Sequence, residues 1–380
     1  MTDTLLRPTA FALAHLTLVD MGPLRGTTSL PLTDEEGKPT NLFLMMGPNG
    51  SGKTTILDAI YRAMALLSSR AHNEYGNDAL DSGDGGLQLD ARVVLDDGAR
   101  SRAFMLSIVA GGPGLLKDWT ADELETAEVD EQIVLAFQRR SATEAVLRAQ
   151  TSHPSAVSFH DAVIAQLGDQ PRDLFETAAG YPTVLYFPSN RGIRRPPREN
   201  AITRPAGYGY APAHLFDTDG ASWASSLDNL FVWFAWLDDG RDERCRDIVN
   251  SLVFRGTKRL GAVDRQNLFV PVEVQETGAS HRLDQLSSGE RQLVQLVVRI
   301  ASHMAGSTIV LIDETEQHLH VVMRRRLMAI MKDWAKSYPQ LAFLFTSHQP
   351  DTFRLLAPSR AEPGLRKSAS LVKPRYRPGQ

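Results

Sequence analysis

The chain has 380 residues, of which 42% are hydrophobic, and a formal net charge of −4. This length fits about two to three domain-sized units, or one core with insertions, and the charge gives no overall field that would attract nucleic acid. Residues 1–16 lack a signal-peptide pattern, no apolar run is long enough to span a bilayer, and Cys245, the single cysteine, cannot form an internal disulfide. These features predict a soluble, cytoplasmic protein.

The periodicity of apolar residues predicts strands and helices in a mixed order. In the first part of the chain we expect a strand at 11–19, a short strand within 21–38, a strand at 41–46, a helix at 54–68, a mobile loop at 69–86, and strands at 87–95 and 102–109. Further along we expect helical structure at 121–167, a strand at 182–187, helical structure at 228–254, a strand at 269–274, a helix at 287–305, a strand at 307–312, a helix at 320–336 and a strand at 341–346.

The alternation of helix and strand after residue 285 is typical of an α/β fold. Four regions are expected: residues 1–110 and 266–358 as the two halves of one nucleotide-binding core, 111–265 as a mostly helical insertion with a core strand at 182–187, and 359–380 as a basic, flexible tail. The antiparallel strands near the N-terminus would lead into the first half of the core.

One glycine-rich motif predicts phosphate binding. It fits G-x-x-x-x-G-K-[ST] between a predicted strand and a predicted helix, and its members are Gly47, Pro48, Asn49, Gly50, Ser51, Gly52, Lys53, Thr54 and Thr55. The glycines let successive N–H groups turn toward a polyphosphate. Lys53 is expected to reach the β- and γ-phosphates, and the Thr54 hydroxyl is expected to ligate Mg²⁺.

A second set of polar residues follows in the C-terminal half. Ser287 and Glu290 have the spacing of a capping box at the start of a helix. Asp313 ends a β-branched strand, where a P-loop enzyme holds Mg²⁺, and Glu314 beside it is placed to polarise the attacking water. His348 ends the next strand, where a histidine can hydrogen-bond a γ-phosphate. Each residue also has a simpler interpretation, as a helix cap, a strand-end acid or a loop histidine.

In this order, the segments GPNGSGKTT, LSSGERQ, IVLIDE and TSH resemble the ATP-binding-cassette (ABC) ATPases. Within them, IVLIDETEQHLH and FTSHQPDTF resemble segments of the AAA-type ABC ATPases grouped with RecF, the chromosome-maintenance proteins and the "overcoming lysogenization defect" nucleases. The resemblance extends to ATPase subunits of bacterial anti-phage defence systems. It covers both ends of the chain and leaves the middle unassigned.

The resemblance implies a P-loop fold with an ABC-type core that binds ATP and Mg²⁺. It implies that Asp313 is the magnesium-site carboxylate, Glu314 the general base and His348 the switch histidine. Ser287, Ser288 and Gly289 would close over the ATP of a second subunit, so that two heads form a homodimer around two ATP molecules.

This sequence departs from the family pattern at several positions. Thr315 and Val321 stand where proline is usual, and Ser288 replaces a common glycine. The glutamine loop of the family pattern is not evident in the sequence. Asn190 or Arg191, after the predicted strand at 182–187, is the candidate for the position of that loop.

Three roles for such an ATPase compete. The first, which is the favoured role, is regulation of a separately encoded effector, a nuclease or toxin, in anti-phage defence. The second is RecF-like DNA repair or recombination. The third, a transporter ATPase subunit, is disfavoured because the spacing from Lys53 to Ser287 is too long. No heptads predict a coiled-coil arm, and no cluster of acidic residues and histidines predicts a nuclease site within the chain.

Two basic stretches are candidates for binding DNA or RNA, or for solvated surface. Residues 190–204 contain Arg191, Arg194, Arg195, Arg198 and Arg204, and residues 365–377 contain Arg366, Lys367, Lys373, Arg375 and Arg377 with Tyr376. An aromatic cluster of Phe231, Trp233, Phe234 and Trp236 is expected to be core more often than a base-stacking platform.

Overall fold

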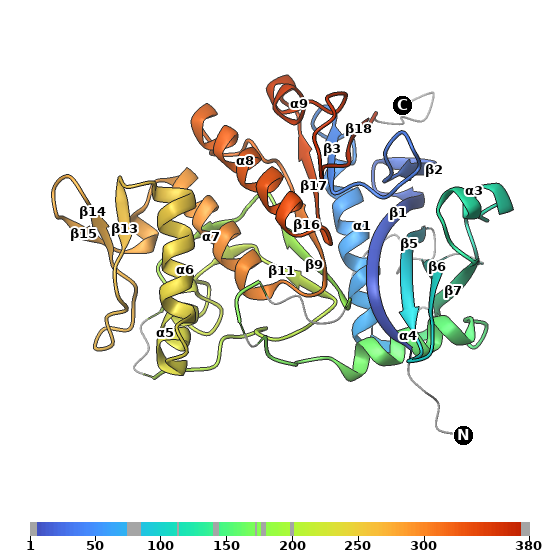
Figure 1. Cartoon of the computed structure of the whole chain (residues 1–380), viewed down its shortest axis with the longest axis horizontal. Coiled ribbons are helices and arrows are strands. Elements are labelled where there is room, and N and C mark those ends of the chain that lie inside the picture. Colours follow the sequence, from blue (N-terminus) through green and yellow to red (C-terminus); the bar gives the residue numbers. More distant parts are fainter. Residues whose placement is uncertain are drawn as a thin grey trace.

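The computed structural model describes residues 6–73, 85–111, 114–139, 144–171, 173–175, 180–197 and 201–373. Two sheets with a helix between them make up one side of the molecule, and further helices make up the other (Figure 1). This arrangement confirms the predicted α/β fold. No helix in the described part of the chain is both long and apolar enough to cross a bilayer.

A parallel sheet forms the centre of the fold. Within the described ranges its strands run in the order β11-β9-β16-β17-β3-β18, and each neighbouring pair is parallel. The strands are β3 (Leu42–Met46), β9 (Pro182–Phe187), β11 (Ala213–Leu215), β16 (Ser307–Ile312), β17 (Leu341–Ser347) and β18 (Lys367–Leu371). Because parallel sheets are covered on both faces, their strands are continuous apolar runs, as the sequence of β16 shows.

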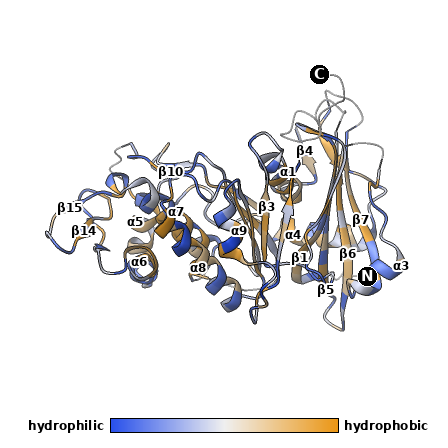
Figure 2. Ribbon diagram, turned by 90° about the horizontal axis from the view of Figure 1, so that it is seen from above, coloured by the Kyte–Doolittle hydropathy of each residue, from blue (hydrophilic) through white to orange (hydrophobic). Residues whose placement is uncertain are grey.

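The two faces of this sheet belong to different hydrophobic cores. On one face, α1 (Lys53–Ala65) packs with Leu311. On the other, α7 (Ser288–His303) and α8 (Val321–Ser337) pack with Ile312. Since successive strand residues point to opposite faces, α1 and α7 lie on opposite sides of the sheet. Figure 2 shows this order of layers, with α7 and α8 on one side of β3 and α1 on the other.

A second, mostly antiparallel sheet covers the far side of α1. Among the described residues its order is β2-β1-β5-β6-β7-β8-β4. Its strands are β1 (Arg7–Met21), β2 (Leu24–Pro31), β4 (Ala71–His72), β5 (Gly86–Asp96), β6 (Ser101–Ala110), β7 (Glu131–Gln138) and β8 (Val146–Arg148). The antiparallel β1–β2 and β5–β6 pairs are those expected from the sequence. Apolar residues of this sheet and of α1 share one core.

Shorter elements complete the fold. They are the turn η1 (Leu66–Ser68), α3 (Ala121–Thr126), α4 (Pro154–Ala165), β10 (Gly192–Ile193), β12 (Thr218–Asp219), α5 (Leu227–Leu237), α6 (Arg241–Val249), the π-turn η2 (Asn250–Phe254), β13 (Lys258–Leu260), β14 (Val272–Val274), β15 (Ser280–His281), η3 (Leu283–Gln285) and α9 (Pro350–Leu356). The expected helical region at 228–254 is thus two helices, which are separated where Asp238 adopts a left-handed conformation with φ 54°. Most of the expected loop, residues 74–84, lies outside the described residues.

The prediction of helical structure at 121–167 was wrong over residues 146–148, which form β8, and over residues 131–138. The latter segment is β7, which pairs in parallel with β6. Ile133, Val134 and Phe137 fit a helical spacing. In the strand, Val134 is only half-buried, and the large buried side chains are Ile133, Leu135 and Phe137, at every second position, with the small Ala136 also buried. In an apolar run this short, the two periods cannot be distinguished until the partner strand is known.

The prediction of a flexible tail at 359–380 was also wrong in part. Residues 367–371 form β18, which pairs in parallel with β3. The side chain of Lys367 is buried, and its Nζ donates to Glu362 Oε1 at 2.8 Å and to the carbonyl of Ala357 at 2.7 Å. The basic residues of this segment predict solvent exposure, but the charge of Lys367 is paired with Glu362 inside the fold. Residues 374–380 lie outside the described part of the chain.

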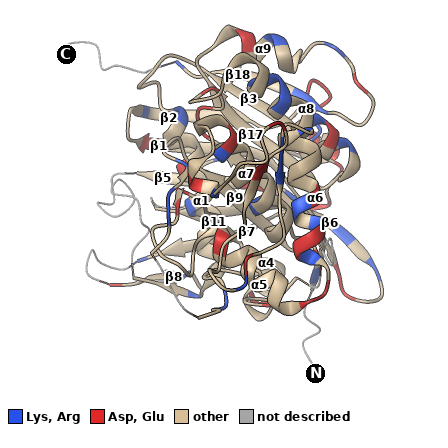
Figure 3. Cartoon of the chain, turned by 90° about the vertical axis from the view of Figure 1, so that its left-hand side faces the viewer, with Lys and Arg blue, Asp and Glu red and all other residues tan. Residues whose placement is uncertain are grey.

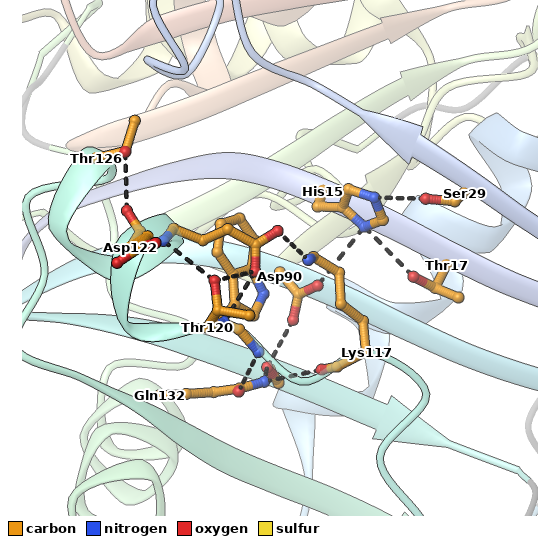
Figure 4. A network of polar contacts seen from close by, with 12 residues as sticks. His15, Thr17, Ser29, Asp90, Lys117, Thr120, Asp122, Thr126 and Gln132 are labelled. Carbon is orange, nitrogen blue, oxygen red and sulfur yellow. Dashed lines mark hydrogen bonds and ion pairs between the residues drawn. The ribbon is translucent and has the colours of Figure 1, made fainter.

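A buried polar network ties the loop after β6 to the antiparallel sheet (Figure 4). Asp90 of β5 accepts hydrogen bonds from Ser107 at 2.5 Å and from Gln88 at 2.8 Å. Burial raises the pKa of Asp90 to about 6. Burial, assisted by the Lys117 ammonium, lowers the pKa of His15 to about 4. Both shifts favour the neutral forms of these buried groups.

These shifts predict a pH dependence of stability. The pKa of Asp90 rises on folding from 3.8, so its contribution to stability is complete below pH 3.8 and is lost as pH rises through about 6. The pKa of His15 falls on folding from 6.5, so its contribution is complete above pH 6.5 and is lost as pH falls through about 4. In the wild type the two trends oppose each other. In Asp90→Asn the contribution of the Asp90 carboxyl is absent. The free energy of unfolding of this variant, relative to that of the wild type, should therefore rise by on the order of 1–3 kcal/mol between about pH 4 and 6.

Thermal or urea unfolding at several pH values measures this difference. Asp96→Asn on the same strand is the control. Hydrogen bonds from Ser101 and Gly98 hold the pKa of Asp96 below its usual value of 3.8, so its effect falls below the tested window. A difference between Asp90→Asn and wild type that is constant from pH 4 to 6 would contradict the assignment.

Candidate functional site

The loop between β3 and α1 has the backbone geometry of a phosphate cradle. Gly50 and Gly52 have φ angles of 75° and 97°, a left-handed region that glycine adopts without strain. A side chain at Gly52 would also lie 2.7 Å from a methyl carbon of Leu24, and one at Gly47 would lie 2.4 Å from the carbonyl oxygen of Val372. Glycine is therefore required at position 50 for its conformation, at position 47 for steric reasons, and at position 52 for both.

Lys53 closes this loop from inside. Its side chain is buried, and its Nζ donates to the carbonyls of Gly47 at 2.8 Å and Pro48 at 2.9 Å. Within the described residues, no carboxylate forms an ion pair with it. A buried ammonium held only by carbonyls is costly, and the first turn of α1, which contains no acidic residue, adds a partial positive charge. The loop is thus arranged to receive an anion.

The other predicted residues of the loop lie around this cradle. Asn49 is exposed, Thr55 is half-buried on the first turn of α1, and Ser51 is buried. The Ser51 hydroxyl has no hydrogen-bond partner.

Thr54 connects the loop to the end of β16. Its hydroxyl donates to Asp313 Oδ2 at 2.8 Å, across 259 positions of sequence. The Thr346 hydroxyl, from the neighbouring strand β17, donates to Asp313 Oδ1 at 2.6 Å. Asp313 is buried, and no ion pair to it is formed by the described residues. A hydroxyl beside an unpaired buried carboxylate is the hard-oxygen donor set that suits Mg²⁺.

Mg²⁺ in such a site keeps several water and phosphate ligands and does not need a protein cage. The described residues contain no group of three or more His, Cys, Asp or Glu side chains that could hold a metal ion. Thr54 and Asp313 therefore fit a magnesium ion that arrives with a nucleotide.

Glu314 has a strained backbone conformation. Its φ angle is 47°, which is unusual for a residue with a β-carbon. Its N–H donates to the Thr346 hydroxyl at 2.7 Å, and its carbonyl accepts from Arg191 Nη2 at 3.1 Å. Strain of this kind persists only where the surroundings impose it, and it is concentrated at functional sites.

His348 is held by Glu316, a residue that the sequence analysis did not single out. His348 Nδ1 lies 2.7 Å from Glu316 Oε1, and the backbone N–H of His348 donates to the same oxygen at 2.7 Å. The side chain of Glu316 is buried, whereas that of His348 is 43% exposed. The only available signal in the sequence was a second acidic residue two positions after Glu314.

Thr315 shows how the chain accommodates a departure from the family pattern. Its N–H donates to the carbonyl of Thr346 at 3.1 Å. Proline has no N–H and would lose this bond. Val321, at the other departure, begins α8 and is 40% exposed.

The predicted signature residues lie at the start of α7. Ser287 caps the helix and forms the expected capping box, in which its hydroxyl donates to Glu290 Oε2 at 2.7 Å. Burial opposes ionisation of Glu290, but hydrogen bonds from Lys258 and Ser287 outweigh it and hold the pKa of Glu290 below its usual value. Ser287 and Ser288 are exposed, and Gly289 is buried against the loop before α8.

The structure thus brings some predicted residues together and keeps others apart. Hydrogen bonds join the P-loop to Asp313, and parallel pairing places β3, β17 and β16 side by side. The signature residues begin a helix that packs on the opposite face of the sheet from α1.

The first basic stretch is not a continuous exposed surface. Arg191 is buried, and Arg204 donates to the carbonyl of Tyr208 at 3.3 Å. Arg194 and Arg195 are exposed. Arg198, Arg375, Tyr376 and Arg377 lie outside the described residues. On the face that carries α6, α7 and α8, basic and acidic segments are intermixed (Figure 3).

The aromatic cluster is divided between core and surface. Phe231 and Phe234 are fully buried, as expected for core. Trp236 is 56% exposed, and its ring stacks on that of Trp233 with 4.8 Å between ring centroids.

Two family models match the chain. Residues 189–353 match the model described as "AAA domain, putative AbiEii toxin, Type IV TA system", and residues 16–89 match the model described as "AAA domain". Together they include the P-loop and the segments around Asp313 and His348. No curated protein matches the chain.

Solved structures show distant likenesses. One is an SMC head domain from Thermotoga maritima, with 12% sequence identity, a TM-score of 0.36, and coverage of 90% of this chain and 92% of that chain. Another is an Smc head domain with an extended coiled coil, bound to the C-terminal domain of ScpA and derived from Pyrococcus furiosus. It has 12% identity, a TM-score of 0.39, and coverage of 91% of this chain and 92% of that chain.

The two hydrogen bonds of the Thr346 hydroxyl predict that this group stabilises the fold. Thr346→Val would leave Asp313 Oδ1 without its 2.6 Å donor and the N–H of Glu314 without its 2.7 Å acceptor. Each buried group left unpaired should lower the free energy of unfolding by roughly 1–3 kcal/mol. Thr346→Ser keeps the hydroxyl and is the control. Denaturant unfolding of both variants measures the difference, and equal stabilities would show that the hydroxyl does not make these bonds.

Proposed function

We propose that this chain, which matches AAA-domain models over residues 16–89 and 189–353, binds ATP with Mg²⁺, hydrolyses it, and dimerises head to tail around it. The hydrogen bond between Thr54 and Asp313 is the observation that carries this proposal. It places the two residues that would hold the metal in one site, beside an uncompensated buried lysine, in the way that P-loop enzymes use these residue types.

Each residue around this site has a distinct task in the proposal. Lys53 would exchange its bonds to the loop carbonyls for bonds to the β- and γ-phosphates, which also relieves its buried charge. Thr54 and Asp313 would hold Mg²⁺, which supplies charge neutralisation on the phosphate oxygens when bound. Glu314 would accept a proton from the attacking water. His348, oriented by Glu316, would donate a hydrogen bond to the γ-phosphate.

The layer order supports a composite site. Ser287, Ser288 and Gly289 begin a helix on the opposite face of the sheet from α1, and the two serines are exposed. An exposed hydroxyl pair at a helix N-terminus is suited to an anion, but the P-loop of the same chain belongs to the other face. A second copy, rotated by a two-fold axis, would present its P-loop to this helix and receive the same contact in return.

We further propose a separately encoded effector, a nuclease or toxin, as the partner that this ATPase regulates. The family model that matches residues 189–353 names a putative AbiEii toxin and a type IV toxin–antitoxin system in its description. This description supports a defence role over DNA repair and transport. A reading frame for a nuclease or toxin beside the gene for this chain is the arrangement that this role requires. A neighbouring membrane permease would contradict it.

Glu314→Gln tests the assigned base. The variant should bind ATP with wild-type affinity because no phosphate contact is removed, while turnover should fall by roughly 10²–10⁴-fold. Unhydrolysed ATP should then accumulate a dimer, visible by size-exclusion chromatography with light scattering in the presence of Mg²⁺. Lys53→Ala is the control that should bind nucleotide weakly and remain a monomer. Wild-type turnover in Glu314→Gln would remove Glu314 from the mechanism.

Complementation tests whether the signature acts across the dimer. Lys53→Ala has an intact signature, and Ser288→Arg has an intact P-loop but a side chain that obstructs a partner. Each variant alone should be inactive. A mixture should recover up to about half of wild-type activity, because each mixed dimer has one complete site of its two. A mixture as inactive as its components would show that the signature serves its own chain.

A further inference from the structure

The guanidinium of Arg191 binds the backbone of the turn that carries Asp313 and Glu314. Its Nη1 donates to the carbonyls of Asp313 at 2.5 Å and Pro188 at 3.1 Å, and its Nη2 donates to the carbonyl of Glu314 at 3.1 Å. One planar group therefore holds two consecutive peptide units. Lysine could not do so in the same way, because its ammonium is a single point without the fixed fork of a guanidinium.

This contact is made by a buried charge. Arg191 is 3% exposed, and no carboxylate forms an ion pair with it among the described residues. Burial lowers its pKa to about 10, although the nearby carboxylates of Asp313, Glu316 and Glu314 favour the charged form. It thus remains a cation at neutral pH, and its Nε has no hydrogen-bond partner. Burying a cation that is bonded only to carbonyls carries a large desolvation cost. A contact kept at this cost is expected to serve the turn that it holds.

The turn that Arg191 holds is the strained one. Glu314 has a φ angle of 47°, a conformation that is sterically unfavourable for a residue with a β-carbon. Thr346 fixes the N–H of Glu314 from one side, and Arg191 fixes its carbonyl from the other. With both ends of the residue held, the direction in which the Glu314 side chain leaves the backbone is set.

Arg191 is itself anchored through a short ribbon to the helix α7. The next two residues form β10, which pairs with β12. Three side chains of α7, spaced four residues apart on one face, hold this ribbon. They are Arg291, which donates to the carbonyl of Ile193 at 3.0 Å, Gln295, which donates to the carbonyl of Asp217 at 2.7 Å, and Arg299, which donates to Asp219 Oδ1 at 2.6 Å. The ribbon that begins beside Arg191 is therefore held to α7 at three points.

We propose that Arg191 is a positioning residue for hydrolysis: it holds the backbone of Glu314 so that the carboxylate faces the attacking water. This inference rests on the proposed role of Glu314 as the base. Arg191 does not need to touch the nucleotide in this role. Its loss should therefore slow the chemical step and leave ATP affinity unchanged, since a displaced catalytic group can cost up to about 10²-fold in rate.

The experiment compares Arg191→Ala with Arg194→Ala in the full chain. Arg194 is an exposed arginine of the same segment and controls for the loss of a positive charge. ATP affinity is measured with a fluorescent ATP analogue, turnover is measured as phosphate release, and amide hydrogen exchange is followed in the peptide that covers residues 313–317. We expect turnover of Arg191→Ala to fall by at least about tenfold at unchanged affinity, with faster exchange in that peptide, and Arg194→Ala to behave as wild type.

Chemical rescue makes the test specific to geometry. Guanidinium ion at low millimolar concentration should enter the space left in Arg191→Ala and restore part of the turnover, whereas methylammonium, a cation without the fork, should not. If Arg191→Ala does not fold, Arg191→Lys takes its place. It should bind ATP normally and turn over more slowly, because one ammonium cannot span both carbonyls.

The outcomes separate this inference from the function on which it rests. A wild-type chain that hydrolyses no ATP would overturn the proposed function, while faster exchange at 313–317 in Arg191→Ala would still support the backbone contact. An active wild type with equally active Arg191 variants would overturn the positioning role alone. A parallel loss of ATP affinity and turnover would also overturn it, because Arg191 would then be a nucleotide-binding residue.

Discussion

The parallel pairing of β3, β17 and β16 is the constraint on which the site depends. Met46 pairs with Ser347, and Phe345 pairs with Ile312. The residues that follow these strands therefore emerge at one edge of the sheet, where the carboxyl ends of parallel strands bind ligands. Segments from opposite ends of the sequence therefore meet at this edge. The burial of both faces of the sheet fixes this register, because a slip by one residue would turn every apolar side chain to the wrong core.

Charge burial at this edge follows a consistent rule. Lys53 and Arg191 are buried cations bonded to backbone carbonyls, and Asp313 is a buried anion bonded to hydroxyls. Direct ion pairs between them would satisfy the charges and occupy the groups that a ligand needs. Carbonyls and hydroxyls instead stabilise each charge partly and leave it able to exchange partners. By contrast, the guanidinium of Arg299, which holds the ribbon, forms an ion pair with the carboxylate of Asp219 at 2.6 Å.

The sequence predicted the elements whose patterns are local and missed those defined by distant partners. The P-loop, the capping box at Ser287 and the strand before Asp313 have strong local signals, and their secondary structure was predicted correctly. β18 has a weak apolar pattern and exists because β3 offers an edge. Arg191 and Glu316 look like surface charges in sequence, and their roles arise from contacts across more than a hundred and across about thirty positions, respectively. Tertiary pairing, which propensity does not contain, decided these cases.

Helix α7 connects the proposed signature residues with the ribbon that anchors Arg191. The helix holds the ribbon that anchors Arg191 and also begins with the exposed residues Ser287 and Ser288. A partner that moves this N-terminus would act on the same helix whose side chains hold the ribbon beside Arg191, and through Arg191 on the backbone of Glu314. If the second copy supplies the contact to ATP, its arrival and the geometry of the base are mechanically linked through one helix. An ATPase built in this way would turn over slowly as a monomer and respond to whatever brings two copies together, which suits a regulatory role better than a metabolic one.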